Sequence, residues 1–287
     1  MRQSLSSRDI QPQDSTPRHS WLSLPGLCCQ AAGGEPRDAD GVAAAWALIY
    51  CAAHIFDAVQ DGDPPEPWWE ALGEGGAINV ATGLLTSAWV VLYRLGIQRR
   101  PIQLLIEDFQ RTGLHMVSGQ HLDLTDPRPS LERAWAVAEA KSGAFFALAC
   151  RSGARMAAAE EDVVARYGVY GLNLGLMVQI SDDLGDLNDG QLAPPLPVAY
   201  CLDTASPQDR ERLMLLMRDC TPNAPSGMEV IEMLGDRGAS LYLGTKLAQF
   251  LARADEALEA AGAVQPARDQ LSALIRSLVP SIEASPL

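Results

Sequence analysis

The residues best suited to chemistry are two groups of aspartates, each at the end of a long apolar run. In the first group, His54, Asp57 and Asp61 are spaced at i, i+3 and i+7, which places all three on one face of a helix. The apolar stretch GVAAAWALIYCAA precedes them. Carboxylates in this position either bind a cation or form the solvated end of the helix, and the spacing leaves both interpretations open.

The second group lies in the stretch YGLNLGLMVQISDDLGDL. Four of its side chains share one helical face: Gln179, Asp182, Asp183 and Asp186. Carboxylates this close repel each other unless a cation neutralises them. Oxygen donors without sulfur or imidazole partners favour Mg²⁺, which commonly bridges carboxylates to phosphates. A solvated acidic helix end is the alternative.

The two groups together predict two carboxylate walls that face each other across a bundle interior and hold metal ions. The expected ligand is a diphosphate, because the metals would invert the negative charge that the carboxylates present. The net charge of −14 argues against nucleic acid or an anionic membrane as a main partner. The composition therefore favours a cation as ligand.

The elements that must position these residues are helices, because Ala, Leu, Glu and Arg recur at helical spacing and strand signals are scarce. We expect an all-α, single-domain helical bundle, with a flexible N-terminal segment at 1–20 and the domain at 21–287. The helices are expected over 39–61, 76–95, 101–121, 130–157, 160–187, 206–219, 226–261 and 265–279. Residues 189–207 read as a connection between two of these helices.

The sequence predicts no membrane-spanning segment and a cytoplasmic protein. The uncharged run from Gly75 to Tyr93 contains polar residues and glycines, so we expect a buried core helix there. The N-terminus lacks the apolar core of a signal peptide. The six cysteines form no CxxC pair, which indicates buried thiols in a reducing compartment rather than a zinc site or a disulfide framework.

The acidic motifs and the segments around them resemble the trans-isoprenyl diphosphate synthases, the polyprenyl synthetase family of the class I isoprenoid synthase fold. The second DDxxD motif of that family is matched in full by DDLGD at 182–186. GGEPRDADGVAAAWALIYCAAHIFDAVQD is similar to the stretch that leads to the first motif, GQHLDL at 119–124 to the GQxxDL signature, and KSGAF at 141–145 to KTGxLF. The resemblance covers well over half of the chain.

The resemblance implies a central cavity, a homodimer, and an allylic isoprenyl diphosphate as substrate. It also implies that Mg²⁺ is bound by five carboxylates: Asp57, Asp61, Asp182, Asp183 and Asp186. Lys141 and Gln179 would act on the same diphosphate as catalytic residues, and Arg18 and Gln120 would help to bind substrate. Positively charged groups at the leaving diphosphate are what ionisation of a carbon–oxygen bond requires.

Single residues keep simpler alternatives. Without the family context Lys141 reads as a surface lysine, and Asp123 either touches the cavity or pairs with His115. In the family, the positions held here by Ala52 and Ala53 set the cavity floor. Because both side chains are small, we expect the cavity to extend toward Ile49 and Trp46 and to accept a long prenyl chain.

The sequence also departs from the family. Ala58 replaces the second aspartate of the first motif, and DGDPPEPWWE contains no basic residue where the family has an Arg-Arg-Gly. Of the N-terminal basic element only Arg18 remains, and Gln191 stands where the family has a lysine. Losing several cationic contacts to a diphosphate should cost several kcal/mol, since each is worth roughly 1.5–3 kcal/mol.

Three functions fit these departures. The first is a prenyltransferase that uses isopentenyl diphosphate or a substitute acceptor, as in the peptide-prenylating enzymes of bacterial quorum sensing. The second is a cyclase-like enzyme that ionises a single allylic diphosphate, and the third is a non-catalytic partner subunit. A helical scaffold protein with solvated acidic helix ends is the unrelated alternative. The acceptor, the product length and the pathway do not follow from the sequence.

Overall fold

The computed structural model describes residues 18–62, 67–96, 100–126, 130–188, 195–218 and 225–279, and every regular element in these ranges is helical. The longer elements before the middle of the chain are α1 (Leu24–Ala31), α2 (Asp40–Asp61), α4 (Gly73–Arg94) and α5 (Arg100–Thr125). They are followed by α6 (Leu131–Ala138), the π-helical turn η3 (Glu139–Gly143), α7 (Ala144–Met156) and α8 (Glu161–Asn188). The last are α9 (Pro195–Thr204), α10 (Pro207–Arg218), α11 (Pro225–Asp236), α12 (Ala239–Ala260) and α13 (Ala267–Arg276). The all-α prediction is confirmed.

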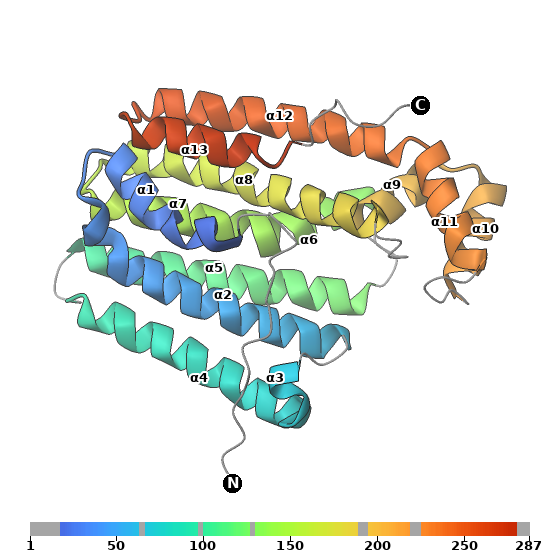
Figure 1. The fold of residues 1–287 in the computed structure, drawn as a ribbon, viewed down its shortest axis with the longest axis horizontal. Helices are drawn as coiled ribbons and strands as arrows, with labels where there is room; N and C mark the ends of the chain where they lie inside the picture. The colour runs from blue at the N-terminus through green and yellow to red at the C-terminus, as the bar shows by residue number, and fades with distance from the viewer. Residues whose placement is uncertain are drawn as a thin grey trace, which may run out of the picture.

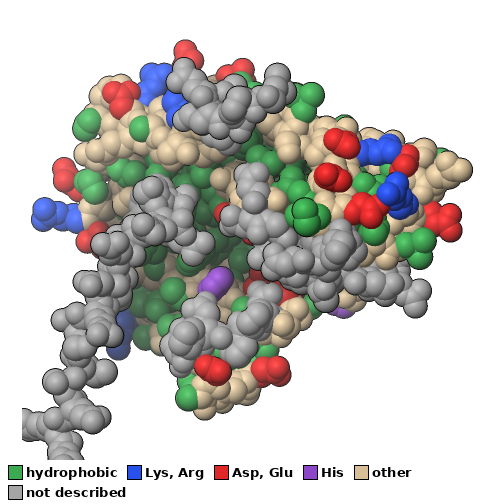
Figure 2. Space-filling view, turned by 45° about the vertical axis from the view of Figure 1, so that its right-hand side comes forward, with side chains coloured by type: hydrophobic (Ala, Val, Ile, Leu, Met, Phe, Trp, Pro, Cys, Tyr) green, Lys and Arg blue, Asp and Glu red, His purple; other side chains and the backbone are tan. Residues whose placement is uncertain are grey.

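The helices form a bundle with α7 and α8 at its centre (Figure 1). α12 and α13 cover one side, α2 and α5 cover the other, and α4 lies beyond α2 at the edge. α9, α10 and α11 make a smaller lobe at one end, with its own buried cluster around Val230 and Leu234. Figure 2 shows acidic and basic side chains interspersed on the surface of this lobe. Two ion pairs lie there, Arg212–Glu229 and Arg237–Asp209.

α8 can lie at the centre because it is apolar on several sides, with Tyr167, Leu174 and Ile180 all fully buried. Two glycines on this helix allow α7 and η3 to approach closely. A Cβ on Gly171 would lie 2.5 Å from the carbonyl oxygen of Phe146, and one on Gly175 would lie 2.4 Å from that of Ser142. Any larger residue there would push the central helices apart.

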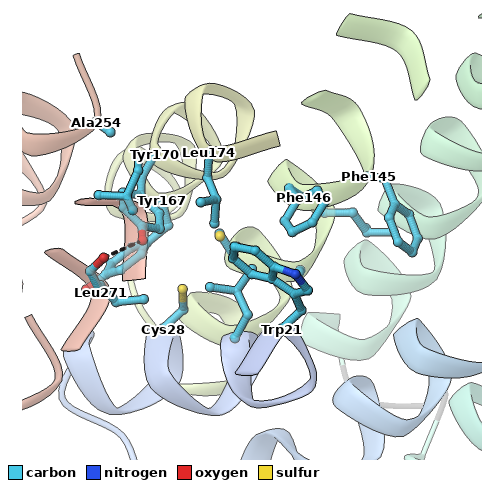
Figure 3. Close-up of a cluster of buried hydrophobic side chains, with 14 of the residues drawn as sticks. Trp21, Cys28, Phe145, Phe146, Tyr167, Tyr170, Leu174, Ala254 and Leu271 are labelled. Carbon is cyan, nitrogen blue, oxygen red and sulfur yellow. Dashed lines mark hydrogen bonds between the residues drawn. The ribbon is translucent and has the colours of Figure 1, made fainter. Parts of the chain in front are cut away.

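The main core lies between α1, α7, α8, α12 and α13 (Figure 3). Trp21 packs edge-to-face on Phe146 with ring centroids 5.3 Å apart. The buried Tyr170 hydroxyl donates a hydrogen bond of 2.9 Å to the carbonyl oxygen of Leu271, so α8 is tied to α13. The described cysteines are free thiols, most of them buried.

α2 spans 40–61 and agrees closely with its predicted range. It ends at Gly62, whose φ of 74° is a left-handed conformation that glycine adopts without strain. Asp57 and Asp61 therefore occupy the last two turns of a rigid helix.

Three expectations about the elements are wrong. The range 130–157 is interrupted by the π-helical turn, and the range 226–261 is two helices that break at Gly238, whose φ is 76°. The stretch 189–207 contains α9, since Pro195 and Pro197 stand in the first turn, where proline is tolerated. The prediction for 1–20 falls mostly outside the described residues.

α4 is not the buried core helix that was expected. It packs on α2 through Ala77, Ala81 and Ala88, while Ile78, Val90 and Tyr93 are exposed. By length and composition alone, two helices could cross a membrane: the segment Pro36–Asp61 and α4, Gly73–Arg94, with 28% and 22% of their apolar windows buried. Core helices pass the same test, so this finding is weak support for a span.

Candidate active site

The first carboxylate wall is held together by Lys141. Its Nζ lies 3.0 Å from Oδ1 of Asp57 on α2 and 2.9 Å from Oδ2 of Asp123 on α5. Asp123 was expected either to touch the cavity or to pair with His115. In the structure it pairs with Lys141, and His115 is exposed. One cation from η3 therefore joins α2 to α5.

Gln120 adds a second link between the same helices. Its Nε2 donates to Oδ1 of Asp61 over 3.3 Å. Its Oε1 is buried and has no hydrogen-bond partner among the described residues. A buried acceptor without a donor is costly, so this oxygen is available to a ligand, a metal-bound water or a solvent molecule.

Burial and the nearby carboxylate of Asp57 raise the pKa of Asp61, although Lys141 and Gln120 oppose the change. Burial lowers the pKa of Lys141, but Asp57 and Asp123 outweigh this and raise it above its usual value. Lys141 is therefore charged at neutral pH. The wall favours an additional positive charge, because its carboxylates repel each other.

The second wall is organised by Gln179 on α8. Its Oε1 accepts a hydrogen bond of 2.9 Å from the Ser142 hydroxyl, and its Nε2 donates to Oδ1 of Asp183 over 2.7 Å. The other oxygen of Asp183 accepts from the backbone N–H of Leu196, at the start of α9, over 2.9 Å. Gln179 and Asp183 thus connect η3, α8 and α9.

The three aspartates of the second motif do not share one environment. Asp183 is only 1% exposed, and burial raises its pKa to about 7 in spite of the bonds from Leu196 and Gln179. Asp182 and Asp186 are exposed. Asp183 therefore connects α8 to the start of α9, a contact that spacing alone did not reveal.

The π-helical turn explains how one segment reaches both walls. Lys141 extends to α2 and α5, while the next residue, Ser142, bonds to α8. π-helical turns are frequent at functional sites because one extra residue redirects the neighbouring side chains. A Cβ on Gly119 would lie 2.7 Å from that of Ala140, so the glycine of the GQHLDL stretch leaves room for the turn.

An aromatic stack joins α2 to α7, and its residues precede Asp57 and follow Lys141 in the chain. Phe145 stacks on Trp46 with centroids 4.5 Å apart and on Tyr50 at 6.1 Å. The Trp46 Nε1 donates a hydrogen bond of 3.0 Å to the carbonyl oxygen of Phe145. Tyr50 lies seven residues before Asp57 on α2, about 10 Å along the helix axis.

Ala52 is 1% exposed and packs with Ala77 and Ala81 of α4. Trp46, toward which the cavity is expected to extend, is fully buried. Ala53 is half-buried. The expected cavity floor at Ala52 and Ala53 stays a prediction. Figure 2 shows a hollow on the face that it draws, with hydrophobic side chains inside it.

The donors suit Mg²⁺ by their chemistry. Within the described ranges, no three His, Cys, Asp or Glu side chains are close enough together to hold an ion alone. Mg²⁺ usually takes one or two carboxylates and completes its shell with water and phosphate oxygens, so such a set is not needed. Asp57 and Asp61 on one wall and Asp182 and Asp186 on the other would hold it. Asp183 would become a further ligand if its hydrogen bond from the Leu196 N–H were broken.

Arg18 and Gln191 stand where the family has basic residues. Arg18 begins the first helical turn, but its side chain lies outside the described residues, as does all of Gln191. The stretch 63–66, within the segment that lacks the family's arginines, also falls outside them.

A family model described as polyprenyl synthetase matches residues 23–193. A short chain isoprenyl diphosphate synthase of Methanothermobacter thermautotrophicus is 29% identical over 83% of this chain and 78% of its own length. A tryptophan prenyltransferase, ComQ of Bacillus subtilis, is 26% identical over 53% of this chain and 49% of its own length.

The fold is also that of solved synthases. A geranylgeranyl pyrophosphate synthetase from Pyrococcus horikoshii superposes with a TM-score of 0.80 at 22% identity, over 91% of this chain and 85% of the other. A geranylgeranyl pyrophosphate synthase from Corynebacterium glutamicum, complexed with isoprenyl diphosphate and magnesium, gives a TM-score of 0.74 at 19% identity, over 91% and 85%. At these identities the likeness concerns the fold.

Proposed function

Because the chain belongs to the polyprenyl synthetase family, and is thus an enzyme that transfers prenyl groups, we propose that it acts on an allylic isoprenyl diphosphate with Mg²⁺. The substrate lies between the end of α2 and the end of α8. The carbon–oxygen bond of the substrate breaks, the electron pair leaves with the diphosphate, and the prenyl group passes to an acceptor. Pyrophosphate is the second product.

The observation that carries this proposal is the position of η3 between the two walls. Lys141 contacts Asp57 and Asp123 on one side, and Ser142 contacts Gln179 on the other, so one short turn links both acidic motifs. A lysine between carboxylates neutralises part of their charge and can turn to a phosphate oxygen. Asp57, Asp61, Asp182 and Asp186 would bind the metal, which stabilises negative charge on the departing diphosphate.

The residues around the site protect the reacting carbon. The rings of Tyr50 and Phe145 form an apolar floor, and their faces are attractive to positive charge. A floor about two helical turns below Asp57 limits the length of the prenyl chain. We therefore expect short allylic substrates to be preferred, in contrast to the long chain that the small residues at 52 and 53 suggested.

The experiment is a measurement of pyrophosphate release from geranyl, farnesyl and geranylgeranyl diphosphates, each with and without isopentenyl diphosphate. We expect release in the presence of Mg²⁺ and none in excess EDTA. No release under any of these conditions contradicts the proposal and favours a partner subunit. Release that needs no acceptor favours the cyclase-like reaction.

A second candidate is transfer to an acceptor without a diphosphate. It is favoured by the absence of basic residues from DGDPPEPWWE and by the likeness to a tryptophan prenyltransferase. Pyrophosphate release that isopentenyl diphosphate does not stimulate, and that an indole-containing peptide does stimulate, would support it. Chain elongation with isopentenyl diphosphate would contradict it.

We also propose a homodimer through α4, and a cytoplasmic location. The exposed hydroxyls of Thr82, Thr86 and Ser87 donate to carbonyl oxygens one turn earlier, at 2.7 to 2.8 Å, so this face has few free donors. It is suited to a second copy of the same helix. The free thiols among the described cysteines support a reducing compartment.

A further inference from the structure

A groove lined by α6, η3, α8 and α12 carries features that the proposed reaction does not use. It has a volume of about 380 Å³ and lies between α6, α8 and α12. This volume falls within the usual range for small-molecule sites, which is about 300–1,000 Å³. Figure 1 places α12 on the side of the bundle opposite α4, so the groove is remote from the proposed dimer face.

The groove combines apolar and aromatic side chains with polar and charged ones. Leu172 and Leu176 come from α8, Trp135 from α6 and Phe250 from α12. The indole and the phenyl ring meet edge-to-face with centroids 5.7 Å apart. The amide of Asn173 donates to the carbonyl oxygen of Val169, and so this polar side chain is turned toward its own helix.

Two cations stand over this apolar surface. The Lys246 Nζ lies 5.9 Å from the ring centre of Trp135 and 5.5 Å from that of Tyr242. The Arg253 guanidinium lies 5.9 Å from the ring of Phe250. No carboxylate among the described residues forms an ion pair with either cation, although Glu139 also lines the groove.

The chain has a net charge of −14 and only two lysines, Lys141 and Lys246. Lys141 pairs with Asp57 in the candidate site, and Lys246 lies over two aromatic rings. A positioned ammonium beside an apolar surface is complementary to an anion that carries an apolar tail.

We propose that this groove is a second, metal-independent binding site for an isoprenyl diphosphate, with Lys246 holding the diphosphate and the wall of Trp135 and Phe250 holding the prenyl chain. The identity of the ligand rests on the proposed function, which supplies such molecules as substrate and product. The first site cannot bind a diphosphate without metal, because its carboxylates repel it. The groove needs no metal, since its cations are side chains.

The test is calorimetric titration of the full chain with farnesyl diphosphate in excess EDTA. We expect one molecule to bind per chain, and Lys246→Gln to weaken binding at least about tenfold, which corresponds to about 1.4 kcal/mol. Arg210→Gln removes the same charge from an exposed position on α10 and should leave binding unchanged. Farnesol and inorganic pyrophosphate should each bind more weakly, because each lacks one half of the ligand.

A second measurement uses the unaltered protein. Because only two lysines are present, amine acylation followed by mass spectrometry reports on each separately. Farnesyl diphosphate in EDTA should slow acylation of Lys246 several-fold and leave Lys141 unaffected.

No binding in EDTA, equal binding by Lys246→Gln, or no protection of Lys246 would overturn the inference. Binding in EDTA without pyrophosphate release in Mg²⁺ would contradict the proposed function instead. The two proposals therefore fail on different measurements.

Discussion

Lys141 has two carboxylate partners on two helices, and the bound diphosphate would be its third. Its replacement by glutamine keeps the length and removes the charge. We expect Lys141→Gln to lower Mg²⁺-dependent pyrophosphate release roughly 10- to 150-fold, because a charge-assisted hydrogen bond is worth about 1.5–3 kcal/mol. Arg133→Gln is the control, since the ion pair of Arg133 with Asp126 is exposed and lies outside the two walls. Equal activity in both variants would exclude a role for Lys141.

At position 58, where the family has an aspartate and this chain has Ala58, a charged group can be added rather than removed. Ala58→Asp restores the second aspartate beside Asp57, so the Mg²⁺ concentration for half-maximal activity should fall several-fold. In EDTA the same variant should unfold at a lower temperature, because a third carboxylate adds repulsion at the end of α2. Ala58→Asn has the same size without the charge and should show neither effect. An unchanged Mg²⁺ requirement in Ala58→Asp would show that position 58 does not reach the metal.

Asp183 predicts a dependence of stability on pH. Its pKa rises from 3.8 to about 7 in the folded protein, so the folded state binds the proton more tightly than the unfolded state. The stability from this group is complete below pH 4 and is lost as the pH rises through 7. In EDTA, the melting temperature of the unaltered protein should therefore fall relative to that of Asp183→Asn between pH 5 and 8. Parallel curves for the two proteins would contradict this.

At the scale of elements, the site depends on the fit between α5 and the π-helical turn. Gly119→Ala would place a methyl group 2.7 Å from the Cβ of Ala140, which must move the turn and Lys141 with it. We expect a clear loss of activity together with a stability loss on the order of 1–3 kcal/mol.

Gly113→Ala is a matched control on the same helix, because nothing lies within 4 Å of a Cβ at that position. It should keep full activity and gain slightly in stability, since alanine is the better helix former. If Gly119→Ala behaves in the same way, the turn is not held by this contact.

For the whole molecule, the proposed homodimer can be tested at the exposed face of α4. A stable dimer buries about 800 Å² per partner, and a charge at its centre is costly. Thr86→Glu should therefore convert the dimer to a monomer in light scattering after gel filtration. Thr245→Glu on α12 is the control, because Thr245 is also exposed and also donates to the carbonyl oxygen one turn earlier. A monomeric unaltered protein, or a dimer that Thr86→Glu leaves intact, would contradict the proposal.

The amino-acid sequence was sufficient to predict the helical class, the bounds of α2 and the grouping of the acidic residues. These follow from local rules, since apolar spacing and a glycine cap act within a few residues. The sequence also indicated Lys141, because KSGAF at 141–145 resembles a short family motif. The break at Gly238 was not predicted, because the sequence has a helical pattern both before and after this glycine.

Which aspartate is buried and where the π-helical turn lies depend on how the helices pack. Asp183 faces α9 because Leu196 comes back to it from thirteen residues away, and Ala52 faces α4 because the two helices pack there. The stack of Trp46 on Phe145 joins residues 99 apart in the chain. Contacts of this kind depend on how helices pack against each other, and no local pattern in the sequence records the side of a helix that its neighbour will cover.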